Sequence, residues 1–369
     1  MQRRHFLTAL GAGAAGIAAA PFVTTAKAAE PETIHWKMVT SWPKNFPALG
    51  TGANEFARLI GVLSGGRLQV KVYGAGEMVP AMEVFDAVSS GTAQMGHSAS
   101  YYWKGKVPAA QFFTAVPFGM NTTETNAWLY HGDGMALWDE IYARHNLKPL
   151  AVGNTGTQMA GWFNKEVKSL ADMKGLKIRL PGLAGEVMNR IGASTLTLPG
   201  SEIFTAMETG VIDAADWVGP YNDLAFGLHQ VAKYYYSPAW NEPSAILEGT
   251  VNMDAWQALP EDLQQVVIQS AKIANHAMVD EFALRNATAL TSLVEEHGVQ
   301  LREFPDDVYA ALYEASNEVL DEFVAEDADA KRVYDSYRAF QQKIAPWTRT
   351  GERGYLDGRA RVLGEDATS

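Results

Sequence analysis

The chain has 369 residues, of which 47% are hydrophobic and 20% are charged, a composition typical of a globular protein with a sizeable core. Its net charge of −12 at pH 7 repels nucleic acids and anionic lipids, so neither is an expected partner, and an anionic ligand would need a local basic side chain. The chain has no cysteine, which excludes disulfide bonds, thiolate metal sites and thiol catalysis.

The first 28 residues have the layout of a twin-arginine signal peptide. Arg3 and Arg4 precede a weakly apolar stretch, 7–23, that consists mostly of Ala and Gly, and residues 26–28 (Ala-Lys-Ala) supply a small-x-small cleavage site. The stretch is short and poor in large apolar residues, which favours a signal peptide over an uncleaved membrane anchor. We therefore expect residues 1–28 to be removed and the mature chain to reach a bacterial periplasm.

Strand and helix patterns alternate over the first part of the mature chain. Such alternation predicts βαβ units and a largely parallel sheet. The predicted elements are a strand over 33–40, a helix around 56–63 that ends at Gly65-Gly66, a strand over 68–72, a helix over 82–89, a strand over 176–180, and helices over 185–191 and 201–209.

Two segments of the chain, 85–94 and 204–213, are similar to each other. Each has the pattern of a helix end, a glycine cap at its seventh position and a strand of small residues. The repeat predicts two similar α/β units and makes residues 95–102 equivalent to residues 214–217. Because ligands bind beyond the carboxyl ends of parallel strands, we expect both segments to face one shared cleft.

The last third of the chain has a helical pattern. Helices are predicted from Pro260 to about residue 296, over 307–327 and over 330–344. The tail after Pro346 is rich in Arg, Gly and Asp and is predicted to be irregular.

Arg179 stands at the end of an apolar strand, directly before Leu-Pro-Gly. A guanidinium group in this place can hold a planar carboxylate with two parallel hydrogen bonds, although a surface salt bridge is the more frequent role of an arginine. In an acidic protein, Arg179 is a natural local site for an anion.

Two amides and two acids form a second set of candidates. Asn154 and Gln158 lie in a glycine-rich stretch, Asp216 precedes Trp217, and Glu242 follows an aromatic run. Taken singly, each has a plain structural interpretation as a polar turn, a solvated acid beside a core tryptophan or a packed aromatic strand. If Gln158 and the two acids converge, however, they would form a hard-oxygen site for a cation, which would also relieve their repulsion of an anionic ligand.

Enzymatic motifs are missing from the sequence. His97 begins a partial nucleophile elbow that lacks the closing glycine, so a structural role is favoured for it. The eight histidines show no zinc-binding spacing, and there is no Walker loop.

Taken in order, these stretches resemble the solute-binding proteins of tripartite ATP-independent periplasmic (TRAP) transporters. The resemblance covers nearly all of the mature chain and is closest to the branch that binds 2-oxo monocarboxylates such as pyruvate, with a lactate-binding relative nearby. The segments that carry it are 41–44 (Ser-Trp-Pro-Lys), 75–77 (Ala-Gly-Glu), 97–103, 153–158, Arg179, 216–221 (Asp-Trp-Val-Gly-Pro-Tyr) and 235–242.

The resemblance implies an α/β, two-lobed periplasmic binding protein fold with a long helix that spans both lobes and a helical C-terminal extension. In this branch the C-terminal helices are exchanged between subunits, which predicts a homodimer, with a monomer as the alternative. The implied domains are the signal peptide 1–28, lobe I over 29–155 and about 245–285, lobe II over 156–244 and about 286–305, and C-terminal helices over 306–369.

The resemblance also implies the roles of individual residues. Arg179 would grip the ligand carboxylate, Gln158 would contact both ligand and cation, and a tyrosine would close the other side of the pocket. The implied ligand-binding residues are Arg179, Gln158, Tyr101, Tyr102, Asn154 and Trp217. The implied metal ligands are Gln158, Asp216, the backbone carbonyl of Trp217, and Glu242.

The predicted function is that of a periplasmic receptor, not an enzyme. It would bind a small 2-oxo or 2-hydroxy monocarboxylate, such as pyruvate or lactate, together with sodium or calcium, and deliver it to TRAP membrane subunits. The similar oxo-acid receptors carry Glu where this chain has Asp216, and the shorter side chain leaves open both the cation and the choice between oxo and hydroxy acid. The alternatives are a receptor for a larger or dicarboxylic organic acid, or a periplasmic enzyme that acts on a hydroxy or keto acid.

Overall fold

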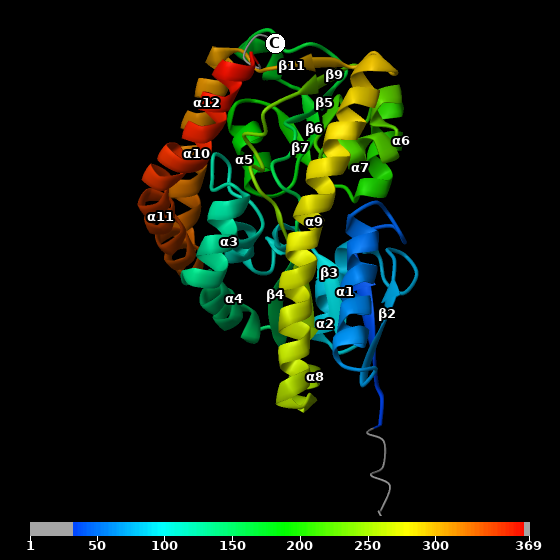
Figure 1. Ribbon diagram of the computed structural model, residues 1–369. Helices are drawn as coiled ribbons and strands as arrows, with labels where there is room; N and C mark the ends of the chain where they lie inside the picture. Colours follow the sequence, from blue (N-terminus) through cyan, green and yellow to red (C-terminus); the bar gives the residue numbers. More distant parts are fainter. Residues whose placement is uncertain (1–31, 365–369) are drawn as a thin grey trace, which may run out of the picture. The chain divides into compact units, whose positions relative to one another are not determined.

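The computed structural model describes residues 32–364, so the predicted signal peptide over residues 1–28 lies outside the described part of the chain. From residue 33 on, the strands form two separate sheets, here called sheet A and sheet B, and helices pack on both (Figure 1). Among the described residues, none of the helices is both long and apolar enough to cross a lipid bilayer.

Sheet A consists of five strands. They lie in the order β2 (Leu68–Tyr73), β1 (Ile34–Thr40), β3 (Met95–Ser98), β10 (Ile246–Asn252) and β4 (Leu147–Asn154). β1 is parallel to β2 and β3, whereas β10 is antiparallel to β3 and to β4. Met38 and Val39, neighbours on β1, point into two different apolar cores, so both faces of the sheet are covered.

Sheet B consists of six shorter strands. They lie in the order β11 (Gln300–Arg302), β9 (Tyr234–Tyr236), β5 (Gly161–Phe163), β8 (Ala214–Ala215), β6 (Lys177–Arg179) and β7 (Ser194–Leu196). β6 is parallel to β7 and β8, but β5 is antiparallel to both β8 and β9.

The prediction of a largely parallel sheet is therefore wrong in part, because two of the four strand pairings in sheet A and two of the five in sheet B are antiparallel. β4 carries the chain out of sheet A and β10 brings it back, so these two strands pair antiparallel over their whole length. β5 and β9 are the ends of the same two crossings in sheet B, and they are antiparallel for the same reason.

The two crossings run beside each other over residues 155–160 and 237–245. Backbone hydrogen bonds join them, from Thr155 N to Ala245 O at 3.0 Å and from Ala160 N to Tyr236 O at 2.8 Å. The predicted lobe boundaries fall at these crossings, and the residue bounds given for each lobe stay a prediction.

The helices complete the fold. The α-helices are α1 (Leu49–Leu63), α2 (Val84–Ser89), α3 (Thr122–His131), α4 (Gly134–Ala143), α5 (Gly182–Arg190), α6 (Gly200–Glu208), α7 (Pro220–Ala225), α8 (Met253–Ala258), α9 (Glu261–Glu295), α10 (Asp306–Glu326), α11 (Ala328–Thr348) and α12 (Gly354–Leu363). The short 3₁₀ helices are η1 (Ala81–Glu83), η2 (Ser100–Trp103), η3 (Pro108–Phe113), η4 (Leu170–Met173) and η5 (Leu228–Gln230), and η6 (Arg349–Arg353) is a π-helical turn.

α9 runs along both sheets (Figure 1). Its first half buries Leu263 and Val267 in the core beside sheet A, and its second half buries Phe282 and Leu293 in a core that contains residues of sheet B. A helix of 35 residues is about 50 Å long, long enough to serve both sheets. The predicted fold class, with one long helix spanning two lobes, is thus confirmed.

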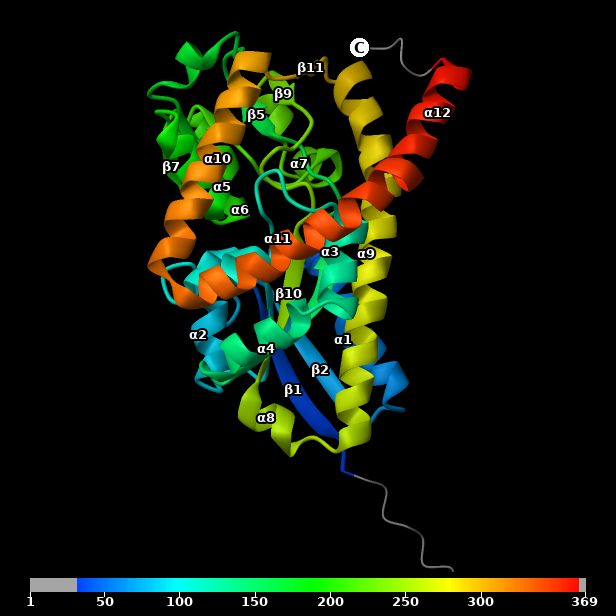
Figure 2. The same ribbon diagram turned by 90° about the vertical axis from the view of Figure 1, so that its left-hand side faces the viewer.

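α10 and α11 pack beside different sheets. Val308 and Leu312 of α10 are buried with residues of sheet B, whereas Val333 and Tyr337 of α11 are buried with helices that cover sheet A. α11 lies across α3 and α4 (Figure 2).

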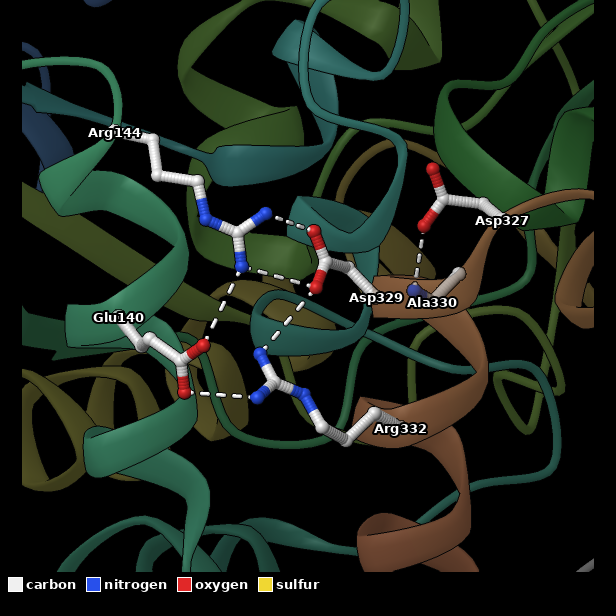
Figure 3. Close-up of polar contacts among 6 residues, drawn as sticks. All are labelled: Glu140, Arg144, Asp327, Asp329, Ala330 and Arg332. Carbon is white, nitrogen blue, oxygen red and sulfur yellow. Dashed lines mark hydrogen bonds and ion pairs between the residues drawn. The ribbon is translucent and has the colours of Figure 1, made fainter.

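The start of α11 is tied to α4 by a ring of four charged side chains (Figure 3). Asp329 accepts hydrogen bonds from Arg144 at 2.5 Å and from Arg332 at 3.3 Å, and Glu140 accepts from the same two arginines at 3.4 and 2.8 Å. Asp327 caps the helix by accepting from Ala330 N at 2.7 Å. Because the ring is solvent-exposed, it orients the helix more than it stabilises the fold.

The predicted repeat is confirmed, and the predicted irregular tail is wrong. Gly91 and Gly210 both have a positive φ, of 80° and 72°, and each follows a helix and precedes a short strand, β3 or β8. The tail continues as helix: α11 runs past Pro346 to Thr348, and the π-helical turn η6 joins it to α12.

Candidate functional site

Arg179 is a fully buried guanidinium group at the end of β6, between β8 and β7. Its Nε donates to the carbonyl of Leu198 at 3.1 Å and its Nη1 to the carbonyl of Asp216 at 2.7 Å. Its Nη2 donates to the Tyr102 hydroxyl at 3.3 Å, and the Trp217 ring lies 5.2 Å from the guanidinium carbon. Since a guanidinium has five N–H groups, two of them are left for a ligand.

Tyr101 and Tyr102 bring the end of sheet A to this arginine. Both lie on η2, directly after β3, and their rings meet edge to face at 4.8 Å between centroids. Tyr101 packs on the first residue of α5, Gly182, whose φ is +66° and where an added Cβ would lie 3.3 Å from the Tyr101 Cβ. The carboxyl ends of β3 and β6, one from each sheet, therefore meet at this point.

Two buried acids lie near Arg179. Asp216 directly follows β8, and one of its carboxylate oxygens is 3.8 Å from Arg179 Nη1. Glu242 lies in the second crossing, where its Oε2 accepts from Gln158 Nε2 at 2.8 Å. Both acids are at most 2% exposed, so two carboxylates and one guanidinium share a site that is shielded from bulk solvent.

The charge in this site is unbalanced. Burial raises the pKa of Asp216 to about 7, and Arg179 opposes this shift. Burial, followed by the negative charge of Asp216, raises the pKa of Glu242 well above its usual range. With both acids ionised, the site would hold one excess negative charge in a medium of low dielectric, which is costly unless a cation balances it.

Several buried oxygens in the site have no hydrogen-bond partner. These are both carboxylate oxygens of Asp216 and the amide oxygen Oε1 of Gln158. The Asn241 amide lies beside Asp216, but no hydrogen bond of normal geometry joins them. Unpartnered buried oxygens near an excess negative charge are what a hard cation such as sodium or calcium requires, so the donor set fits a metal ion.

Trp217 has two separate roles in the structure. Its ring is a core aromatic, edge to face with Trp42 and Phe46 and tilted against Phe226, as the plain structural interpretation predicted. Its backbone lies between Asp216 and the turn into α7, next to the site.

Asn154 was predicted to bind the ligand, but both polar atoms of its side chain already make hydrogen bonds within the protein. It is fully buried at the end of β4, where its Nδ2 donates to Ser244 Oγ at 3.0 Å and its Oδ1 accepts from Gly156 N at 2.8 Å. These bonds tie the two crossing segments together. The structure thus brings together Arg179, Gln158, Tyr101, Tyr102, Asp216, Trp217 and Glu242, and it places Asn154 at the crossing beside them.

His97 is buried and neutral, in keeping with the structural role predicted for it. Its Nδ1 accepts from the Trp42 indole at 2.7 Å, and burial lowers its pKa to about 3. Among the described residues, no group of three or more His, Cys, Asp or Glu side chains is placed to hold a metal. A cation here would accordingly depend on amide and backbone oxygens as well as on the two acids.

Residues 38–327 match the model of the DctP family, bacterial extracellular solute-binding protein family 7. The chain belongs to this family. It is 43% identical over 324 residues to a monocarboxylate 2-oxoacid-binding periplasmic protein of Nostoc sp. (strain PCC 7120), covering 87% of this chain and 88% of the relative.

The solved structures similar to this DctP protein include two that hold a cation and a small carboxylate. One is a TRAP periplasmic solute-binding protein from Pseudoalteromonas atlantica T6c with bound sodium and pyruvate, 40% identical, with a TM-score of 0.86 over 88% of this chain and 99% of that chain. The other is a TRAP transporter solute-binding protein from Bordetella bronchiseptica RB50, 36% identical, with a TM-score of 0.88 over 91% of this chain and all of that chain. It is a mixed-occupancy dimer with copurified calcium and picolinate in an active site and with an apo site.

Two buried residues beside the site of this DctP protein were missed from the sequence. Asn241 is 1% exposed with both amide atoms unpartnered, and its position just before Glu242 in a candidate stretch could have indicated it. Asp223 lies on α7, and its two side-chain partners, Trp162 and Tyr235, come from distant strands, so the local pattern alone did not indicate it.

The buried carboxyl group of Glu248, on β10, should make the free energy of unfolding depend on pH. It is buried, it accepts hydrogen bonds from the Trp103 indole and, at 2.7 Å, from the Tyr142 hydroxyl, and burial raises its pKa to about 7. The folded protein therefore holds a proton that the unfolded chain releases above about pH 4.5. The stability that this group contributes is present below about pH 4.5 and is lost as the pH rises to about 7.

We expect the free energy of unfolding of the wild type, relative to Glu248→Gln, to fall by about 3 kcal/mol between pH 4.5 and 7.5. Urea unfolding at several pH values measures this difference. Glu326→Gln, which changes an exposed acid, is the control and should run parallel to the wild type. Parallel curves for Glu248→Gln as well would show that Glu248 has no raised pKa.

Proposed function

We propose that this protein is the periplasmic receptor of a TRAP transporter and binds a small 2-oxo or 2-hydroxy monocarboxylate together with a sodium or calcium ion. The observation that carries the proposal is a fully buried arginine with two free N–H groups facing two buried acids whose charge it cannot balance alone. A carboxylate and a cation together would complete this set of charges.

Each residue then has a chemical role. Arg179 would hold the ligand carboxylate with its two free N–H groups, and the hydroxyl of Tyr102 would lie beside it. Asp216, Glu242, Gln158 Oε1 and the Trp217 carbonyl would hold the cation, which supplies positive charge for the oxygen next to the carboxylate. Asn154 would act through the crossing segments that it joins.

The burial of the site residues and the ligands of two relatives favour a small ligand. Arg179, Asp216, Glu242 and Tyr101 are between 0 and 8% exposed, so the site is enclosed on all the sides that these residues line. Pyruvate in the Pseudoalteromonas protein and picolinate in the Bordetella protein both carry one carboxylate with a donor atom next to it. This chemistry favours a small monocarboxylate over a larger or dicarboxylic acid.

Thermal-shift measurements test the proposal. Pyruvate, lactate and larger mono- and dicarboxylates are compared in sodium chloride, in calcium chloride and in choline chloride with a chelator. A rise in melting temperature that needs both a small monocarboxylate and a cation is expected. The absence of any such rise would refute the proposal, and preference for a dicarboxylate would support the larger-acid alternative. Conversion of the bound acid, followed by NMR, would indicate an enzyme instead.

We also propose that the protein forms a homodimer through its C-terminal helices. The transporter's membrane subunits are its other proposed partners. α11, α12 and the turn between them leave five large apolar side chains at least 48% exposed, namely Trp347, Tyr355, Leu356, Val362 and Leu363. Exposed apolar groups of this kind favour a covering partner, and the Bordetella relative is a dimer. Sedimentation equilibrium tests this proposal: a mature chain that is monomeric at micromolar concentration would refute it.

Export through the twin-arginine route is a proposal as well. It is supported by Arg3 and Arg4 ahead of the weakly apolar stretch, and by membership in an extracellular solute-binding family. Replacing both arginines by lysine should leave the precursor in the cytoplasm, whereas unchanged export would point to the general secretory route.

A further inference from the structure

Asp223 is a buried carboxylate on the short helix α7 that the proposed ligand set does not use. It is 1% exposed, and both its oxygens are engaged. Its Oδ2 accepts from the Trp162 indole at 2.9 Å and from the Tyr235 hydroxyl at 2.6 Å, and its Oδ1 accepts from the backbone N–H of Val218 at 3.2 Å.

The two ring donors hold this carboxylate in one orientation. Trp162 on β5 and Tyr235 on β9 face each other in the register of sheet B, and their rings stack with centroids 4.0 Å apart. Both residues are fully buried, so the rings cannot easily rotate away. Oδ1 of Asp223 is therefore presented to Val218 from a rigid support.

The bond to Val218 determines the direction of a neighbouring carbonyl. The N–H of Val218 and the C=O of Trp217 belong to the same planar trans peptide, and in such a peptide the two groups point in opposite directions. A carboxylate that holds the N–H consequently turns the Trp217 carbonyl away from Asp223. The negative charge at the N–H end also polarises the peptide and makes its oxygen a better ligand for a hard cation.

The peptides on either side are held as well. The Asp216 carbonyl accepts from Arg179 Nη1 at 2.7 Å, and the Val218 carbonyl accepts from Met159 N at 3.0 Å. Asp223 supplies the bond that fixes the peptide between these two. Without it, the Val218 N–H would be a buried donor with no partner, and this peptide would be free to turn.

We propose that Asp223 is a positioning residue for the cation: it orients the Trp217–Val218 peptide so that the Trp217 carbonyl can serve as a metal ligand. The inference rests on the proposed function, because it assumes that a cation binds next to Trp217. Asp223 itself acts only through the peptide that it holds and is not a ligand.

The inference is tested by calorimetric titration of the Asp223→Asn variant. The variant is titrated with calcium chloride alone, and with sodium chloride in a buffer whose ionic strength is balanced with choline chloride. The asparagine side chain cannot accept from Val218 N and the Trp162 indole at once, since one of its two ends is now a donor. We expect affinity for the cation to fall about 10- to 100-fold, the usual effect of losing such a supporting contact. Asp321→Asn, an exposed acid on α10, is the control for lost negative charge and should bind like the wild type.

A second measurement separates positioning from a general loss of structure. Pyruvate affinity of Asp223→Asn should return to the wild-type value at saturating calcium, whereas a distorted site would bind pyruvate weakly at every calcium concentration. Tyr235→Phe removes one support of the carboxylate and keeps the bond to Val218, so an intermediate, several-fold loss of cation affinity is expected even if Asp223→Asn does not fold.

The outcomes distinguish this inference from the proposed function. If the wild type binds neither cation, the proposed function fails. If the wild type binds a cation and a folded Asp223→Asn binds it within about twofold of the wild type, the positioning role of Asp223 is refuted and the proposed function stands. Should Asp223→Asn not fold, wild-type cation affinity in Tyr235→Phe refutes the inference.

Discussion

Arg179→Met is expected to weaken the binding of small monocarboxylates by at least about 100-fold, because it removes the buried cationic group that would pair with the ligand carboxylate. The same variant should bind a cation at least as tightly as the wild type, since a positive charge 3.8 Å from Asp216 is removed. Calorimetric titration with pyruvate at saturating sodium or calcium, and with each cation alone, measures both effects.

Because affinity for the carboxylate should fall while affinity for the cation should not, misfolding of the variant cannot explain the expected result. A misfolded variant would lose both affinities, whereas Arg179→Met should lose only one. Arg190→Met is the matched control, because Arg190 is a partly exposed arginine of the adjacent helix α5 that pairs with Glu318 and Glu322. Pyruvate affinity within tenfold of the wild type would remove Arg179 from its proposed role.

Asp216→Asn is expected to lose the cation and, with it, most of the carboxylate affinity. The change removes one of two charged oxygen donors while keeping the size of the side chain, so we expect cation affinity to fall by about 100-fold or more. Pyruvate binding should become weak and independent of added sodium or calcium, because ligand and cation no longer assist each other. Metal content after purification and calorimetry with and without cation measure these effects.

Asp216→Glu is the matched conservative variant. It introduces the longer acid that the family resemblance implies for oxo-acid receptors at this position, so it should keep cation binding while changing the preference between sodium and calcium. Metal content and pyruvate affinity in Asp216→Asn equal to those of the wild type would show that Asp216 is only a buried structural acid.

Much of the fold followed from local patterns. The alternation of 33–40 and 68–72 and the long helical period after Pro260 predicted β1, β2 and α9 to within about two residues, because these elements bury one face or stripe of apolar side chains. The antiparallel crossings and the helical tail after Pro346 could not be predicted from local patterns. Both depend on the path of the chain through the rest of the fold. Short strands such as β8, of two residues, gain their partners only from the rest of the sheet.

The candidate site could also be predicted only in part from the sequence. The repeat of 85–94 in 204–213 placed Tyr102 and Asp216 at the ends of equivalent strands, and Arg179 was indicated by its place at the end of an apolar strand. The contact between Arg179 and Tyr102 across two sheets, however, joins residues 77 positions apart. It exists only because β3 and β6 end at the same place.

The sequence by itself thus determined which residue types stand at the strand ends and in the crossing segments, because helix and strand periods, glycine caps and apolar runs are local properties. Only the tertiary structure decided that Asp216, Gln158 and Glu242 are buried around Arg179, that Asn154 is engaged in the crossing, and that Asp223 holds the Val218 peptide. Burial and hydrogen-bond partners depend on segments that are far apart in the chain and meet only after folding. The excess negative charge that argues for a cation comes from that meeting and from no single stretch of residues.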